Sequence, residues 1–182
     1  MAVQFEDLLD RDDIDRLEII EGEIRERAPG TMDHAGAQHG VCGGLRLFNG
    51  KPGQHGPGGW RLGIAVHVSY SQVNVFCHDL AGWRRGRTER PTGFPTTLSP
   101  DWACEILAPG YEKRDLVDKA RVLHAAEVPY YWTVSPEERE LLVRRWAPSG
   151  YQIVLRSAAG ETVRAEPFDA IEIAVRDLLG DD

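Results

Sequence analysis

One acidic residue inside an apolar strand constrains the fold of this chain more than any other feature. In the segment 101–107, DWACEIL, apolar Trp102, Cys104 and Ile106 share one parity, and Glu105 has the other. A period of two is typical of a strand. Glu105 therefore lies in an apolar run, where a free carboxylate is costly unless another group pairs with it. We expect a buried strand and a partner that holds this acid.

Strand-like and helical patterns alternate along the rest of the chain. Segments 60–70 and 73–80 are rich in β-branched and aromatic residues and predict a hairpin. A helix is expected from about 34 to 48 with Asp33 as its N-cap, and another over 111–128. Four short strand-like runs follow between 129 and 166. A chain of 182 residues with 42% hydrophobic content and no internal repeat predicts a single α/β domain, 1–182, with a mixed central sheet flanked by helices.

Bulk charge and cysteine usage restrict the classes of function. The formal net charge of -8 argues against attraction of the whole surface to nucleic acid or anionic membrane. The three cysteines lie far apart without C-x-x-C pairing, which is typical of a reduced intracellular chain. The first twenty residues lack a secretion signal, and no apolar run approaches membrane-spanning length. We therefore expect a cytoplasmic protein that does not bind membranes.

A local basic segment, WRRGRTER (83–90), departs from this acidic background. It carries Arg84, Arg85, Arg87 and Arg90 against a single glutamate. Such a segment is either a solvated arginine loop or a loop that contacts nucleic-acid phosphates. The spacing of the residues leaves both interpretations open.

A second acid, Asp79, ends the strand-like run VNVFCHD. Two carboxylates on neighbouring central strands can bind a hard cation such as Mg²⁺, which takes oxygen ligands and keeps several waters. Asp101 and Glu105 share parity but lie about 13 Å apart along one strand, too far to share an ion. Asp79 and Glu105 can share one if their strands pair in register.

Lys119 and the histidines are weaker candidates. Asp115 precedes Lys119 by four residues on a predicted helix, and this spacing favours a surface ion pair. The alternative places Lys119 over the strand ends, where it would orient a water or offset charge on a phosphate. The six histidines show no zinc spacing, and His39, early in a helix, is either a supporting residue or simply packed or solvated.

The order of several segments resembles a known family. These segments are LEIIEGEI, the His39-Gly40 pair, HDLAGWRR, PDWACEILAPG, RDLVDK, VPYYWTVSPEERELLVRRW and GYQIV. Together they are similar to the Uma-type restriction endonucleases, a branch of the PD-(D/E)XK nuclease superfamily. The resemblance implies a restriction-endonuclease-like core over about 17–175.

The resemblance also implies roles for individual residues. Asp79 and Glu105 would hold Mg²⁺ or Mn²⁺, with Glu23 as a candidate third acid. Leu107 stands where the superfamily has its usual lysine, and Lys119 would replace it to position the attacking water. The implied activity is metal-assisted hydrolysis of DNA phosphodiester bonds.

Two other functions remain open from the sequence. His78 replaces the usual proline before Asp79, and the turn after Glu105 has become 108–111, APGY, so a catalytically decayed binding or assembly module is one alternative. An enzyme acting on a small acidic or nucleotide substrate is another. The aromatic and apolar runs PYYWTV and LLVRRW are also expected to offer surface for a homodimer.

Overall fold

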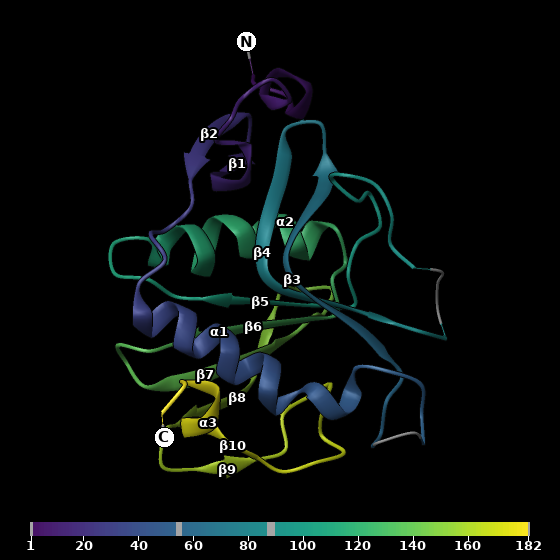
Figure 1. Cartoon of the computed structure of the whole chain (residues 1–182), viewed down its shortest axis with the longest axis vertical. Coiled ribbons are helices and arrows are strands. Elements are labelled where there is room, and N and C mark those ends of the chain that lie inside the picture. The colour runs from purple at the N-terminus through teal and green to yellow at the C-terminus, as the bar shows by residue number, and fades with distance from the viewer. Residues whose placement is uncertain (1, 54–55, 87–89, 182) are drawn as a thin grey trace.

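A computed structural model describes residues 2–53, 56–86 and 90–181. Its centre is an eight-stranded sheet in the order β2-β1-β4-β5-β6-β7-β8, with β3 paired to β4 (Figure 1). β5 and β6 run parallel and the other pairs are antiparallel, so the sheet is mixed as predicted. The strands are β1 (Leu17–Ile20), β2 (Glu23–Glu26), β3 (Trp60–Ser71), β4 (Asn74–Arg84), β5 (Trp102–Ile106), β6 (Tyr130–Ser135), β7 (Glu140–Arg145) and β8 (Gln152–Ala158).

Helices cover both faces of the sheet. The α-helices are α1 (Met32–Gly44), α2 (Ala120–Ala125) and α3 (Val175–Leu178), and a small sheet pairs β9 (Thr162–Val163) with β10 (Ile173–Ala174). Three 3₁₀ turns span Phe5–Leu8, Ile14–Arg16 and Arg46–Phe48, and a π-helical segment, Arg114–Lys119, leads into α2. Figure 1 shows β5 and β6 between α1 and α2. None of the described helices is long and apolar enough to cross a membrane.

The period of two in β5 is confirmed by packing on the two faces. Cys104 and Ile106 pack in the core that includes Val41 of α1. Ala103 packs instead with Leu123 of α2. Because strand residues alternate between faces, Glu105 is placed on the α2 side, under the π-helical segment.

The start and packing of α1 differ from expectation. Thr31, not Asp33, is the N-cap, because the Thr31 hydroxyl oxygen accepts a hydrogen bond of 3.2 Å from the backbone N–H of His34. The helix ends at Gly44 and a 3₁₀ turn continues the chain. A Cβ atom at Gly40 would lie 2.2 Å from the Asp177 carbonyl oxygen, so this glycine allows α1 to approach α3.

The segments expected to provide surface for a dimer lie in the sheet interior. PYYWTV forms most of β6 and LLVRRW most of β7, both central strands. Tyr131, Trp132 and Leu141 are fully buried. The expectation that these runs offer exposed apolar surface is therefore wrong, because strands flank both runs and most of their apolar side chains are buried.

Candidate functional site

The candidate site lies where the β4–β5 ladder ends. Leu80 pairs with Cys104, and beyond this pair the next residues are Asp79 and Glu105. The two strands are neighbours, as the metal-site prediction required. On the other side of β4, Ala65 of β3 has a left-handed φ of 51° between the pairs Ile64↔Leu80 and Val66↔His78. A non-glycine residue with this φ marks a local distortion of the strand, and it stands opposite Asp79.

The distortion coincides with a break in the alternation of side chains along β4. His78 contacts Glu105, on the α2 side of β5. Asp79 contacts His34 and Leu80 packs with the core around α1, so two consecutive residues lie on the α1 side. The structure therefore brings the two acids to the same end of one ladder but directs their carboxylates to different partners.

Asp79 accepts hydrogen bonds on both carboxylate oxygens. Oδ1 lies 3.0 Å from Arg27 Nη2 and 3.2 Å from His34 Nε2, and Oδ2 accepts a 2.8 Å bond from the Ile106 N–H. Burial disfavours the charge, but the hydrogen bond and charge of His34, with the Ile106 amide and Lys119, hold the pKa of Asp79 below its ordinary value. Asp79 is therefore an ionised, fully bonded carboxylate at neutral pH.

Glu105 lies in a buried chain of hydrogen bonds. Its Oε1 contacts His78 Nδ1, and His78 Nε2 lies 2.7 Å from the Tyr70 hydroxyl. Burial, together with the charge of Lys119, lowers the pKa of His78 to about 3, so the ring is neutral. A neutral ring in this arrangement donates its Nδ1–H to Glu105 and accepts the Tyr70 O–H.

Lys119 lies among three carboxylates. Its Nζ is 2.7 Å from Glu18 Oε1, 3.2 Å from Glu105 Oε2 and 3.4 Å from Asp115 Oδ1, and its side chain is 1% exposed. The i,i+4 pair with Asp115 exists, but it is buried and not the expected surface pair. Burial disfavours the ammonium, yet Glu105, Glu18 and Asp115 outweigh it and raise the pKa of Lys119. Lys119 is therefore a permanent cation and not a general base.

Arg114 is a second cation in this cluster: it lies 3.0 Å from Asp115 Oδ2 and 3.9 Å from Glu18 Oε2, so Glu18 and Glu105 depend most on Lys119. Burial raises the pKa of Glu105 to about 7; Lys119 opposes this rise, and the charges of Asp79 and Glu18 add to it. Glu18 Oε2 is buried and has no hydrogen-bond partner among the described residues. In this cluster Lys119 therefore stays protonated, while the ionised form of Glu105 is disfavoured.

Several of these residues escaped the sequence interpretation. Glu18 lies in the apolar strand LEII. An acid inside an apolar strand is the same signal that singled out Glu105, but the prediction placed the third acid at Glu23. Arg27 and His34 had no local signal, because they lie in a loop and at a helix start, far in sequence from Asp79.

The other predicted residues lie elsewhere. Glu23 is on β2 in an exposed ion pair with Arg25, and its side chain is 65% exposed. His39 is exposed on α1, whereas His34 of the same helix contacts Asp79.

The basic segment lies at the far end of β4. The guanidinium of Arg84 lies 4.5 Å from the ring centroid of Trp60, and Arg85 donates a 2.9 Å bond to the Trp60 carbonyl oxygen. Arg87 falls outside the described residues.

No group of three histidine, cysteine or acidic side chains in the described part of the chain is arranged to hold a metal ion. The oxygen donors of Asp79 and Glu105 are nevertheless of the kind that Mg²⁺ and Mn²⁺ prefer. Glu18 Oε2 is buried and accepts no hydrogen bond from the described residues, with Arg114 Nε 3.9 Å away, so it could still accept a cation. The residues present therefore fit a divalent cation by donor type.

The fold is that of a known nuclease-like structure. A crystal structure from Anabaena variabilis, described as a putative nuclease belonging to DUF820, superposes with a TM-score of 0.72 at 15% sequence identity, covering 97% of each chain. This similarity defines the class of fold. A family model, Uma2, described as "Putative restriction endonuclease", matches residues 2–176. The chain belongs to the Uma2 family, and the resemblance read from the sequence is confirmed. No curated protein matches the chain.

Proposed function

We propose that the protein is a divalent-metal-dependent nuclease that hydrolyses DNA phosphodiester bonds at the end of the β4–β5 ladder. The observation that supports it best is the buried contact of Lys119 with Glu105. Glu105 and Asp79 are the residues that directly follow the last pair of the β4–β5 ladder, Leu80↔Cys104. An acid that costs free energy to bury, beside a permanent cation, is an arrangement found more often in functional sites than in ordinary cores. Membership of the Uma2 family supports the same assignment.

In this proposal Asp79 and Glu105 hold Mg²⁺ or Mn²⁺. The ion, when bound, would lower the pKa of a water and offset charge on the phosphate. Among the N-terminal acids we include Glu18, which lies in the cluster and has one oxygen without a hydrogen bond from the described residues, in place of the exposed Glu23. Arg27 and His34 would have to release Asp79 Oδ1 for an ion to reach it, because both contact that oxygen.

The chain's own groups would then prepare the acids. Lys119 favours the ionised form of Glu105, and the His78 ring fixes the orientation of that carboxylate. Asp115 also pairs with Arg114, so Glu18 and Glu105 compete for Lys119, and Lys119 acts here by positioning Glu105. It would orient an attacking water once a bound ion had relieved that competition. Arg84 and Arg85 are the proposed phosphate contacts, together with Arg87.

A cleavage assay tests this function. Purified protein is incubated with plasmid and linear DNA in Mn²⁺, in Mg²⁺ and with a chelator. We expect cleavage that needs the metal and is lost in Glu105→Gln, while Glu172→Gln, an exposed acid paired with Arg164, keeps full activity. Cleavage that persists in Glu105→Gln, or no cleavage of DNA by the folded wild type, would contradict the proposal.

A specific observation favours a second candidate, the catalytically decayed module. Every carboxylate oxygen of Asp79 and Glu105 already has a protein partner, so the structure holds both acids in closed networks. Calorimetric titration with Mn²⁺ separates the candidates. Binding that Asp79→Asn abolishes favours the nuclease; the absence of any such binding favours the module.

A further inference from the structure

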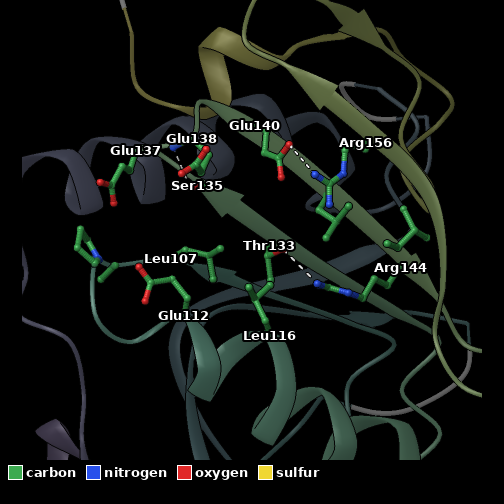
Figure 2. A pocket seen from close by; sticks show the side chains of 14 residues that line it. Leu107, Glu112, Leu116, Thr133, Ser135, Glu137, Glu138, Glu140, Arg144 and Arg156 are labelled. Atoms are coloured by element: carbon green, nitrogen blue, oxygen red, sulfur yellow. Dashed lines mark hydrogen bonds and ion pairs between the residues drawn. The ribbon is translucent and has the colours of Figure 1, made fainter.

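A pocket lies on the same face of the sheet as Glu105. It has a volume of about 350 Å³ and opens beside the turn that follows β5 (Figure 2). Thr133 of β6 pairs with Glu105 on one side and with Leu142 of β7 on the other, and Leu142 pairs with Arg156 of β8. Because directly paired residues share a face, the pocket extends from the strand next to Glu105 across two further strands.

A buried arginine without an acidic partner lines this pocket. Arg144 is 9% exposed, and its Nη1 donates a 3.2 Å hydrogen bond to Thr133 Oγ1. Its guanidinium also lies 5.5 Å from the ring centroid of Tyr131. No carboxylate pairs with it among residues 2–53, 56–86 and 90–181. Since buried charges are normally paired, this guanidinium lacks an anion.

Two hydroxyl donors line the pocket, and Thr133 is the one beside the guanidinium. Thr133 Oγ1 accepts from Arg144, whereas Ser135 lies beside Glu138 and its Oγ accepts a 3.1 Å bond from the Glu138 N–H (Figure 2), so each hydroxyl still has its own O–H to donate. Both residues are buried. Arg156, whose side chain is 62% exposed, adds a second guanidinium and lies 3.5 Å from Glu140. Two guanidinium groups and the Thr133 hydroxyl suit the three oxygens of a phosphate better than the two of a carboxylate.

The pocket has opposite charge at its two ends. Figure 2 shows Arg144 and Arg156 at one end, where Glu140 pairs with Arg156, and Glu112, Glu137 and Glu138 at the other. Apolar side chains, among them Leu116 and Leu142, line the space between. The acids would repel a continuous polyanionic strand but would accept hydrogen bonds from hydroxyl or amino groups. The volume lies at the small-ligand end of the range for binding pockets.

We infer that this pocket binds a small organic phosphate of the kind of a nucleoside monophosphate. The phosphate lies against Arg144, Arg156 and the Thr133 hydroxyl, the body of the ligand packs on the leucines, and its polar groups face the glutamates and Ser135. Neither Asp79 nor Glu105 lines this pocket, so it is separate from the proposed metal site. The inference does not depend on nuclease activity.

Isothermal titration of the full chain at low salt, with a chelator present, tests the inference. The probes are the four common ribonucleoside monophosphates, inorganic phosphate and succinate. We expect at least one monophosphate to bind, with affinity about tenfold to a hundredfold weaker in Arg144→Gln and about threefold to tenfold weaker in Arg156→Gln. Arg164→Gln is the matched control for Arg156→Gln, because Arg164 is a similarly exposed arginine 3.6 Å from Glu172. It should bind like the wild type.

Three results would overturn the assignment: no binding of any monophosphate, binding that Arg144→Gln leaves unchanged, or succinate binding as tightly as the monophosphates. If Arg144→Gln does not fold, Arg156→Gln decides, because Arg156 is an exposed residue of the pocket lining.

Discussion

Lys119 and Arg144 are both buried cations on the α2 side of the central sheet, but their surroundings are opposite. Lys119 contacts three carboxylates, from β1, β5 and the π-helical segment. Arg144 contacts a hydroxyl and an aromatic ring and lines a cavity. A cation enclosed by acids already has its counter-charges within the protein, whereas a cation beside an open cavity can still take an anion from a ligand. Burial alone does not separate these two cases, but the partners do.

Replacing each cation by methionine tests this difference most strongly. Lys119→Met leaves the buried Glu18 and Glu105 without their closest cation, while Asp115 keeps Arg114, and we expect a loss of about 3–5 kcal/mol in the free energy of unfolding. Arg144→Met, the matched change, removes a buried charge that has no counter-ion, and the free energy should change by less than about 1 kcal/mol or rise. Urea unfolding followed by tryptophan fluorescence measures both. Equal losses would show that the two cations have the same role.

The pH dependence of stability distinguishes the same two regions. The folded state raises the pKa of Glu105 from 4.5 to about 7, so it binds this proton more tightly than the unfolded state does. Stability should therefore fall as pH rises from about 4.5 to about 7, by roughly 3 kcal/mol for this group. Unfolding measured across that range should lose this slope in Glu105→Gln and keep it in Arg144→Met. A Glu105→Gln protein with the wild-type slope would assign the titration to another group.

Asp79 and Arg27 form an ion pair of intermediate exposure, with side chains 6% and 24% exposed. A double-mutant cycle with Asp79→Asn and Arg27→Met should give a coupling free energy of about 1–2 kcal/mol, smaller than the effect of Lys119→Met. Denaturant unfolding of the four proteins provides the measurement. A coupling near zero would mean that Arg27 is already free to leave Asp79.

The smallest effect is expected at a solvent-exposed pair. Arg121 and Glu21 form an ion pair in which both side chains are more than half exposed. Arg121→Gln should change the free energy of unfolding by less than about 0.5 kcal/mol, because water and salt screen the pair. A larger change would show that this pair contributes to the packing of α2 against the N-terminal hairpin.

Much of the site's location was predictable from local patterns. The alternation in 102–106 predicted which residues face which layer, and the β-rich runs predicted the hairpin that carries Asp79. The neighbouring positions of β4 and β5 were also predicted. Local alternation failed at Asp79, because Ala65 on the opposite strand adopts a left-handed conformation that apolar patterning does not signal.

The identity of the charge partners was not predictable in the same way. Lys119 was expected either at the surface or over a phosphate, and it is instead enclosed by Glu18, Glu105 and Asp115. Glu18 lies 101 positions before Lys119 in the sequence, and only the pairing of β1 with β4 brings it near. Arg144 had no signal, because a missing partner can be recognised only when all neighbours are known.

The sequence by itself determined the mixed α/β sheet, the placement of Asp79 and Glu105 on neighbouring central strands, and the burial of Glu105 in an apolar interior. These features depend on residue type and on a period of two. Only the tertiary structure decided that Asp79 turns toward α1, that three acids share Lys119 and that Arg144 faces an open pocket. The reason is physical: charge pairing and cavities depend on distances of a few ångströms between residues far apart in the chain, and local spacing does not encode those distances.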